Sequence, residues 1–113
     1  MPFIDCKITE KLTEEKKEEI KRKFGQAVTC LHKTESYLMA GFADGYDLYL
    51  GGKKLKKGAY LAVSLYGTAS ASDYEKMTQA LCKIMGETLQ IPADCIYITY
   101  REVSDWGWNG SNF

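Results

Sequence analysis

Apolar and polar side chains alternate along the first residues of the chain. In the stretch PFIDCKIT, every second residue is apolar, at Ile4, Cys6 and Ile8. This period of two is typical of a strand with one covered face. Proline is tolerated at the first position of a strand, because that residue need not donate a hydrogen bond to the sheet. The pattern therefore predicts a strand from Pro2 to about Thr9.

A helical period replaces the alternation in LTEEKKEEIKRKFGQAVTCL. Its apolar residues recur every three or four positions, at Ile20, Phe24, Ala27, Val28 and Leu31. Thr13 is placed to cap the helix, and the two glutamates that follow suit the positive end of the helix dipole. We interpret the charged run EEKKEEIKRK as the solvated face of this helix.

Three short runs of β-forming residues follow between turn signals. They cover Tyr37–Ala43, Asp47–Leu50 and Ala59–Tyr66, separated by Asp-Gly, Gly-Gly and Lys-Gly pairs. The lysine-rich segment KKLKK before the last run is interpreted as an exposed hairpin tip. Its lysines could attract an anion, but solvation is the preferred interpretation.

A second helical stretch, SASDYEKMTQALCKIMGETL, carries an apolar stripe made of Tyr74, Met77, Leu81, Ile84, Met85 and Leu89. Ser72 and Glu75 have the spacing of a capping box at its start. After the turn IPAD, the stretch CIYITYREV alternates again and predicts the last strand.

The elements form two strand-helix-strand units, Pro2 to Ala43 and Ala59 to Val103. Each helix is long enough for a right-handed crossover between parallel strands. We therefore expect an α/β (α+β) fold, in which two β-α-β units form one mixed four-stranded sheet with both helices on one face. The 113 residues fit a single domain, residues 1–113.

The second face of this sheet has no predicted cover. By alternation it carries Tyr60, Ala62, Ser64, Tyr66, Tyr97 and Thr99. This set is too aromatic for open solvent and too polar for a core, which predicts an oligomer interface.

The charge and hydropathy of the chain indicate which kinds of partner and which cellular compartment to expect. Lysine plus arginine and aspartate plus glutamate balance at 15 each, so bulk charge predicts neither a nucleic-acid nor a membrane partner. The N-terminus has no apolar run behind a basic start, and no stretch approaches the length of a membrane span. A cytoplasmic protein without a signal peptide is expected, and release without a leader stays open.

The chain has few residues of the types that bind metals or carry out redox chemistry. Cys6, Cys30, Cys82 and Cys95 lie far apart without a C-x-x-C pair, and His32 is the single histidine. This distribution predicts neither a zinc site nor a redox motif, so no metal or cofactor is expected. The cysteines are interpreted as reduced thiols in the core.

Pro2 has a second interpretation beside the structural one. Removal of Met1 would leave a secondary amine at the end of a rigid strand. An α-amino group titrates near ~8 in water, and apolar walls or a nearby lysine lower that pKa. Such an amine can act as a base near neutral pH.

Several pieces of the sequence together resemble one family. They are MPFI, Lys33 four residues before YLMAGF, DLYLGG, IYITY and the tail WGWNGSNF. Over the whole chain these resemble the macrophage migration inhibitory factor family of the tautomerase superfamily. The resemblance implies a homotrimer around a central channel, with active sites at subunit boundaries. In such proteins Met1 is removed, and the amine of Pro2 carries a proton in the keto–enol tautomerisation of small aromatic keto acids.

The resemblance also implies roles for individual residues. Lys33 would hold the substrate carboxylate or enolate, Tyr37 would line the pocket, and Thr68 would offer backbone contacts on its floor. The remaining contacts would come from the tail, with Trp106, Trp108 and Phe113 as an aromatic wall, and from a neighbouring subunit, with Tyr97 and Thr99.

Two positions depart from the family pattern. Thr99 stands where the mammalian type carries an asparagine, so a hydroxyl replaces an amide. Trp106 stands where a smaller aliphatic residue is usual. Its larger ring should narrow the mouth of the pocket or add a stacking surface. The Cys-x-x-Cys of some members is replaced by YLAV, so a thiol-redox activity has no support.

The resemblance implies three alternative functions. The first is a phenylpyruvate/dopachrome-type tautomerase. The second is a cytokine-like interaction protein, whose trimer surface binds a protein receptor and whose tautomerase activity is residual. The third is another chemistry of the superfamily, such as dehalogenation or decarboxylation. That third class generally uses arginines near the proline amine, and this chain has only Arg22, on the first helix, and Arg101, at the end of the last strand.

Overall fold

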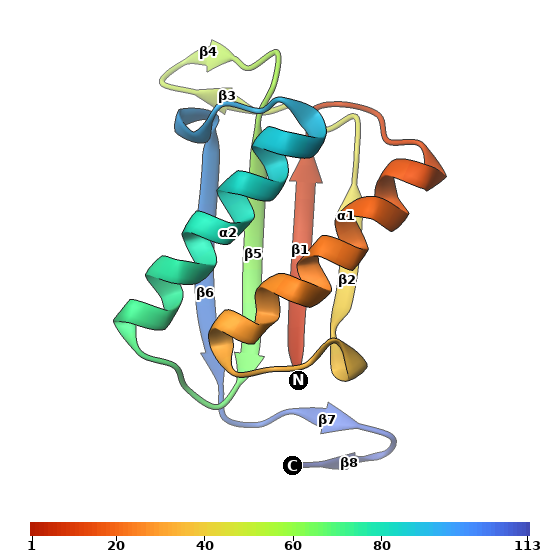
Figure 1. The fold of residues 1–113 in the computed structure, drawn as a ribbon, viewed down its shortest axis with the longest axis vertical. Helices are drawn as coiled ribbons and strands as arrows, with labels where there is room; N and C mark the ends of the chain where they lie inside the picture. Colours follow the sequence, from red (N-terminus) through yellow and green to blue (C-terminus); the bar gives the residue numbers. More distant parts are fainter.

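Four strands form one mixed sheet at the centre of the molecule (Figure 1), in a computed structural model that describes residues 1–113. The order is β2-β1-β5-β6. β1 is parallel to β2, β5 is parallel to β6, and β1 and β5 pair antiparallel in the middle. The bounds are Pro2–Ile8 for β1, Met39–Ala43 for β2, Ala59–Tyr66 for β5 and Ile96–Val103 for β6. The predicted mixed four-stranded sheet is confirmed.

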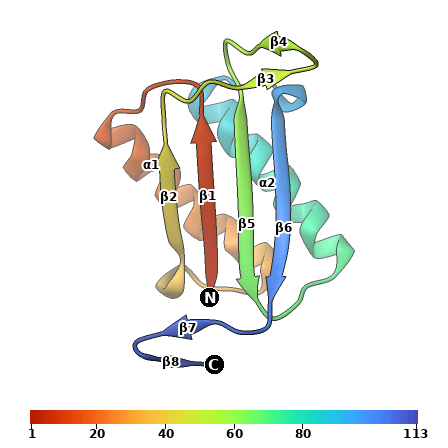
Figure 2. The ribbon, with the colours of Figure 1, turned by 180° about the vertical axis from the view of Figure 1, so that it is seen from behind.

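Both long helices, α1 (Glu14–Ala27) and α2 (Ala71–Leu89), cover the same face of the sheet. Viewed from behind, the strands lie in front and no helix covers them (Figure 2). Each helix links two parallel strands, as expected for crossover connections. Neither helix combines the length and the apolar character needed to cross a membrane.

The start of α2 corrects one sequence-based prediction. Its capping box is formed by Ser70, whose side chain accepts from the Asp73 N–H at 3.1 Å, and by Asp73, whose carboxylate accepts from the Ser70 N–H at 3.2 Å. The predicted box of Ser72 and Glu75 is wrong. The helix already begins at Ala71, so Ser72 has helical backbone and cannot be the extended N-cap residue.

The start of α1 agrees with the prediction. The Thr13 hydroxyl accepts from the backbone N–H of Lys16 at 3.1 Å. At its other end the α-helix stops at Ala27, and the last predicted turn is a 3₁₀ helix, η1 (Val28–Leu31). η1 ends at His32 in the left-handed conformation, with φ 59°, which redirects the chain toward the sheet.

A short hairpin, with two residues in each strand, lies beyond the four-stranded sheet. Its strands are β3 (Tyr49–Leu50) and β4 (Lys53–Lys54), paired antiparallel. The turn is formed by Gly51 and Gly52, both at positive φ, as a tight hairpin turn requires. The prediction that KKLKK forms the hairpin tip is therefore wrong, because its first two lysines belong to β4.

Shorter elements complete the chain. Two 3₁₀ turns, η2 (Glu35–Tyr37) and η3 (Ala93–Cys95), precede β2 and β6, and η2 is why β2 begins two residues later than predicted. After β6, the chain ends in a small hairpin, β7 (Gly107–Trp108) and β8 (Ser111–Asn112).

The core lies between the helices and the sheet. Every second residue of β1 and β5 is buried there, which confirms the alternation in the sequence. All four cysteines are unpaired, but only Cys6 is fully buried, so the expectation of core thiols holds for one residue. Burial raises the pKa of the Cys6 thiol to about 12 and keeps it unreactive.

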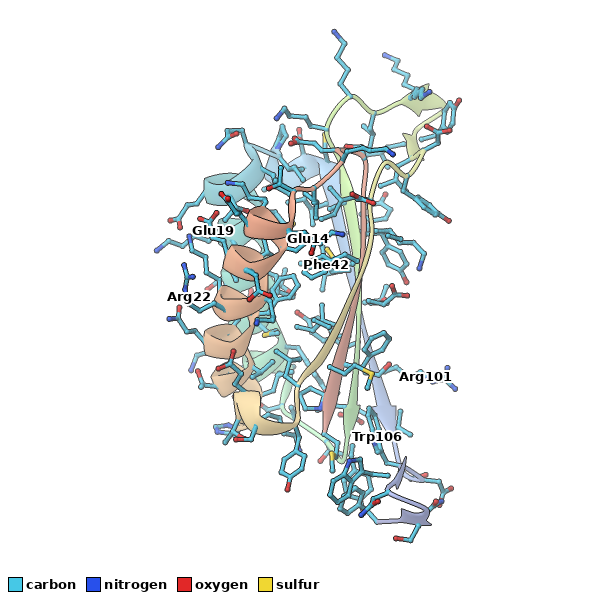
Figure 3. All side chains as sticks on the ribbon, turned by 90° about the vertical axis from the view of Figure 1, so that its right-hand side faces the viewer. Glu14, Glu19, Arg22, Phe42, Arg101 and Trp106 are labelled. Carbon is cyan, nitrogen blue, oxygen red and sulfur yellow. The ribbon has the colours of Figure 1, made fainter.

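The second face of the sheet carries the residues that alternation placed there. Figure 3 views the sheet nearly edge-on, with the helices on one side and Arg101 extending from the other. The Tyr60 and Thr99 hydroxyls are 2.8 Å apart on this face, and the Tyr97 side chain is 63% exposed. We call this surface the open face.

Candidate active site

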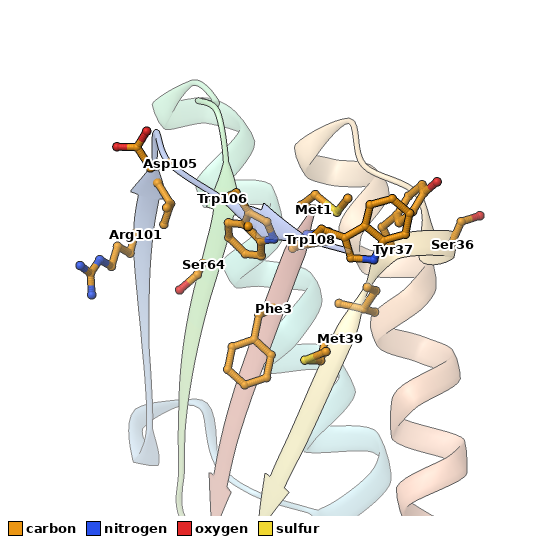
Figure 4. A pocket seen from close by; sticks show the side chains of 14 residues that line it. Met1, Phe3, Ser36, Tyr37, Met39, Ser64, Arg101, Asp105, Trp106 and Trp108 are labelled. Atoms are coloured by element: carbon orange, nitrogen blue, oxygen red, sulfur yellow. The ribbon is translucent and has the colours of Figure 1, made fainter. Parts of the chain in front are cut away.

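The largest hollow lies at the end of the sheet where β1 begins and β6 ends (Figure 4). Its volume is about 680 Å³. Four of the residues predicted for the site line it, namely Pro2, Tyr37, Trp106 and Trp108. This size and this mixture of aromatic and polar walls are typical of a small-molecule site.

Pro2 is the first residue of β1 and is buried at the floor of this pocket. The ladder with β5 extends to Met1, whose carbonyl accepts from the Tyr66 N–H at 3.0 Å. Because proline has no N–H, its nitrogen takes no part in the ladder. Independently of Met1, the pairing of Pro2 with Leu65 and of Phe3 with Met39 positions this nitrogen.

Lys33 approaches the same end of the sheet from the loop after η1. Its Nζ donates to the Tyr66 carbonyl at 3.0 Å, and the residue is half-buried. Lys33 does not line the pocket itself, but its charge acts on the N-terminus. The pKa of the Met1 amine lies below its usual value, first because of burial and second because of the positive charge of Lys33.

His32, beside Lys33, faces a different part of the molecule. Its Nε2 lies 3.3 Å from the carboxylate of Asp73 at the start of α2, and its side chain is largely exposed. It does not line the pocket.

The C-terminal hairpin supplies an aromatic wall. Tyr37 meets Trp108 edge to face, with ring centroids 5.7 Å apart, and Trp108 stacks on Phe113 at 6.2 Å. Phe113 in turn packs against Tyr66 at 5.5 Å. The Phe113 N–H donates to the Trp106 carbonyl at 3.0 Å and closes the hairpin. The structure thus brings together the predicted residues of the tail and Tyr37.

The point where this tail leaves the sheet is held by Glu102. Its carboxylate accepts from the Tyr74 hydroxyl at 2.6 Å and from the Ala69 N–H at 3.2 Å. These bonds lower the pKa of Glu102, while burial and the nearby carboxylate raise that of Tyr74 to about 12. Glu102 therefore ties the end of β6 to the segment before α2.

Besides Lys33 and Phe113, three further predicted site residues do not line the pocket within one chain. Thr68 is exposed in the loop between β5 and α2, and no side-chain bond holds it. Tyr97 and Thr99 lie on the open face, nearer the β3–β4 hairpin. Tyr97 lines a separate apolar hollow of about 60 Å³, together with Tyr49 and Leu50 of β3.

Sequence reasoning missed other residues that line the pocket, among them Phe3, Met39, Ser64, Arg101 and Asp105. Alternation could place Phe3 and Ser64 on the open face. Which of these residues lie side by side depends on the register between neighbouring strands, and the sequence pattern does not specify this register.

Comparisons with known proteins agree with this geometry. The model of the macrophage migration inhibitory factor (MIF) family matches residues 1–113. A comparison with curated protein sequences found no significant match.

Among solved structures, MIF2 of Leishmania major is similar, with 28% identity and a TM-score of 0.93 over 100% of this chain and 97% of that one. The MIF homologue of Prochlorococcus marinus has 26% identity and a TM-score of 0.88 over 98% of both chains. A fused 4-OT described as a symmetric trimer shares the fold, with 16% identity and a TM-score of 0.85, over 97% of this chain and 94% of that one.

Proposed function

Because the chain belongs to the macrophage migration inhibitory factor family, we propose that it is a keto–enol tautomerase acting on phenylpyruvate-like aryl pyruvates. One observation carries this proposal. Pro2, directly after Met1, is buried and lines an aromatic pocket, and the charge of Lys33 acts on this N-terminus.

In the mature protein the nitrogen of Pro2 is the base. Removal of Met1 converts it from an amide nitrogen, which has no basicity, into a secondary amine. The burial and the Lys33 charge that lower the pKa of the Met1 amine would act on this nitrogen in the same direction. Because an α-amino group starts near ~8, a downward shift makes the amine neutral and basic near pH 7.

The reaction moves one proton between carbon and oxygen. In the keto-to-enol direction, the Pro2 nitrogen accepts a proton from the carbon next to the carbonyl, and the electron pair of that C–H bond moves to give the enolate. Lys33 stabilises the developing negative charge. The enolate oxygen then takes a proton from the Pro2 ammonium, either directly or through a water molecule that receives the ammonium proton in its turn, and this regenerates the amine.

The pocket walls fit an aryl substituent. Tyr37, Trp106 and Trp108 present ring surfaces, and aromatic rings favour edge or offset contacts of the kind already present between Tyr37 and Trp108. A planar aryl group is therefore the substituent that this pocket suits best.

We also propose that the protein is a homotrimer in which Tyr97 and Thr99 reach the pocket of a neighbouring subunit. The uncovered open face with its exposed Tyr97 supports this assembly, and the 4-OT relative described as a symmetric trimer has the same fold. Light scattering should give a trimer mass at micromolar concentration, and a monomer mass would contradict the shared site.

The activity test compares two forms of the protein. The decay of the enol form of phenylpyruvate and of hydroxyphenylpyruvate is followed by absorbance or ¹H-NMR, with intact-mass spectrometry to establish whether Met1 is present. We expect turnover only from the form that begins at Pro2. Full activity in a form that keeps Met1 would exclude Pro2 as the base, and no turnover by either form would exclude the tautomerase.

A further inference from the structure

The two hairpins of the chain have turns of the same geometry but different chemistry. Gly51 and Gly52 join β3 to β4, and both have positive φ. Asn109 and Gly110 join β7 to β8, with φ 52° and 82°. Positive φ at both positions is the signature of the type I′ turn, for which Asn-Gly and Gly-Gly are preferred pairs. The turn of the C-terminal hairpin therefore differs from the other in carrying a side-chain amide directly before a glycine.

The surroundings of Asn109 and Gly110 leave the two residues free to react with each other. Both are exposed, and the Gly110 N–H donates no hydrogen bond. Because glycine has no side chain, its nitrogen is accessible to the side-chain carbonyl carbon, Cγ, of the residue before it. Figures 1 and 2 show this hairpin beyond the end of the four-stranded sheet, so the turn is not part of the open face that the proposed trimer covers.

Asn112, the other asparagine of the chain, lies in the same hairpin and serves as an internal reference. It is paired with Gly107 in the ladder of β7 and β8. The residue after it is Phe113, whose N–H donates to the Trp106 carbonyl at 3.0 Å. The nitrogen that would have to attack the Asn112 side chain is therefore held in a hydrogen bond and flanked by an aromatic side chain. The two asparagines share a hairpin but differ in reactivity.

We propose that Asn109 is a site of spontaneous deamidation, and that the isoaspartate formed there loosens the aromatic wall of the pocket. Hydroxide or water removes the proton from the Gly110 nitrogen, which then forms a bond to Cγ of Asn109. The bond between Cγ and the side-chain nitrogen breaks, and this nitrogen takes a proton from water and leaves as ammonia. The product is a cyclic succinimide.

Hydrolysis of the succinimide gives two products. One water adds to either carbonyl carbon of the ring, and the bond from that carbon to the Gly110 nitrogen breaks. Opening at Cγ gives aspartate in an unchanged chain. Opening at the backbone carbonyl gives isoaspartate, in which the chain runs through the former side chain and is longer by a methylene group. The whole sequence consumes one water and releases one ammonia, so it needs no oxidant, reductant or further reactant.

The C-terminal hairpin is small enough to open and permit ring closure. β7 and β8 have two residues each, and all of them are exposed. An isolated two-stranded hairpin is only marginally stable, and the ends of a chain open locally most easily. Opening lets Asn109 rotate until its Cγ faces the Gly110 nitrogen.

The two products should affect the pocket differently. Asp-Gly is itself a preferred pair for a type I′ turn, so the aspartate form keeps the hairpin. Isoaspartate lengthens the loop, and loop length fixes the register of the strands on either side. Trp108 directly precedes the turn and contacts Tyr37 at 5.7 Å and Phe113 at 6.2 Å between ring centroids. A change of register therefore displaces Trp108 from these two rings.

The modification is tested by incubating the whole mature protein at neutral and at mildly alkaline pH. Peptide mass spectrometry measures the replacement of NH₂ by OH, and methylation by protein L-isoaspartate methyltransferase measures isoaspartate. We expect both at position 109 and neither at Asn112, at a rate that rises with hydroxide concentration because the Gly110 nitrogen must lose its proton. The proposal is overturned if Asn109 stays unmodified while a synthetic WNGSN peptide reacts completely, or if Asn112 reacts as fast.

Two variants separate the longer chain from the added charge. Asn109→Asp carries the charge without the extra methylene group, and when fresh it should have the tryptophan fluorescence of the parent protein. Asn109→Gly gives this turn the Gly-Gly pair of the β3–β4 hairpin, has no amide to lose, and should keep its fluorescence throughout the incubation. In the parent protein, the emission should move to longer wavelength as isoaspartate accumulates, because Trp108 leaves its ring contacts and meets water.

The mass and fluorescence measurements do not depend on the proposed tautomerase function, so they decide the inference even if no substrate is turned over. If phenylpyruvate is turned over, kcat/KM of the parent protein should fall in proportion to the isoaspartate fraction, while that of Asn109→Gly stays constant. Isoaspartate that accumulates without a change in emission would overturn the link between this turn and the aromatic wall. A shift in Asn109→Gly as fast as in the parent protein would do the same.

Discussion

The two ends of the central sheet have the same topology but different surroundings. Each β-α-β unit begins with a strand that is central in the sheet, and Ala59, the first residue of β5, corresponds to Pro2, the first residue of β1. At the Ala59 end, the β3–β4 hairpin leaves an apolar hollow of about 60 Å³. At the Pro2 end, the C-terminal hairpin encloses about 680 Å³. The duplicated fold thus offers two similar strand starts, but only one of them carries a nitrogen that can become a free amine.

A lysine at each end of the sheet sharpens this contrast. Lys57 donates to the Leu89 carbonyl at 2.8 Å, much as Lys33 donates to that of Tyr66, but Lys57 is also paired with the carboxylate of Glu10 at 2.9 Å. Lys33 has no acidic partner within ion-pair distance. Its charge is therefore left to act on the N-terminus, whereas the charge of Lys57 is neutralised locally.

The largest expected effect comes from abolishing what distinguishes Pro2 from Ala59. Insertion of one alanine between Met1 and Pro2 makes the Pro2 nitrogen an amide, as the nitrogen of Ala59 already is. We expect kcat/KM for phenylpyruvate to fall by at least ~100-fold, the lower range for loss of a general base. Pro2→Gly, which keeps an amine on a more flexible residue, should lose less. Circular dichroism should show an intact fold in both variants. Activity at the parent level in the insertion variant would contradict the role of the Pro2 amine as the base.

A smaller effect is expected from the two lysines. Lys33→Ala should lower kcat/KM by about 2–4 kcal/mol in transition-state free energy, as for loss of an oxyanion donor, with both kcat and KM worsened. Lys33→Arg should recover part of this loss. Lys57→Ala is the matched control and should lower thermal stability without changing kcat/KM. Equal kinetic effects of Lys33→Ala and Lys57→Ala would show that Lys33 has only a structural role.

The same pair of variants tests the electrostatic argument through pH. The charge of Lys33 lowers the pKa of the N-terminal amine, so its removal raises that pKa. The amine is then protonated up to a higher pH, and the acidic limb of the kcat/KM profile should move upward in Lys33→Ala. Lys57→Ala should leave the limb in place. An unmoved limb in Lys33→Ala would mean that the lysine charge does not reach the base.

The sequence predicted the fold because its main signals are local. Alternation in PFIDCKIT and the helical stripes ending at Leu31 and Leu89 defined two repeated units, and crossover rules then fixed both helices on one face. Local signals erred where two neighbouring choices were chemically similar. Ser70 and Ser72 could both cap a helix, and only the extended backbone of Ser70 decides between them.

The site was less predictable because it joins distant segments. Pro2 was singled out by its place behind Met1 at the start of a strand, and Tyr37, Trp106 and Trp108 were found through family resemblance. The structure brings these four together. Arg101 was noted as one of two arginines, at the end of the last strand, and was not placed at the site, since its place in the pocket depends on the β5–β6 register. No pattern in the sequence specifies that alignment.

A further comparison concerns Trp106, for which the Ala59 end has no counterpart. This half-buried ring lines the pocket. Trp106→Val should raise KM for phenylpyruvate by a few-fold, consistent with ~0.5–1.5 kcal/mol for an aromatic contact, while kcat changes little. If KM is unchanged and kcat falls instead, Trp106 acts on the reacting atoms rather than on the aryl group.

The smallest expected effect compares two carboxylates, Glu102 at the Pro2 end and Asp44 at the other. Asp44 accepts from the Leu12 N–H at 2.7 Å, and this bond lowers its pKa, as the bonds from Tyr74 and Ala69 lower that of Glu102. A carboxyl whose folded-state pKa is lowered contributes stability above its unfolded value, and this contribution is lost as the pH falls through the folded value.

Glu102→Gln and Asp44→Asn should therefore each lower Tm at neutral pH by no more than a few degrees and flatten its decline below about pH 4.5. Only Glu102→Gln should also raise KM for phenylpyruvate, because Glu102 fixes the point where the aromatic tail leaves β6. Melting curves from pH 3 to 7, together with steady-state kinetics, measure both effects. If Asp44→Asn raises KM as much as Glu102→Gln does, the pocket responds to general stability, and the bonds of Glu102 do not position the tail.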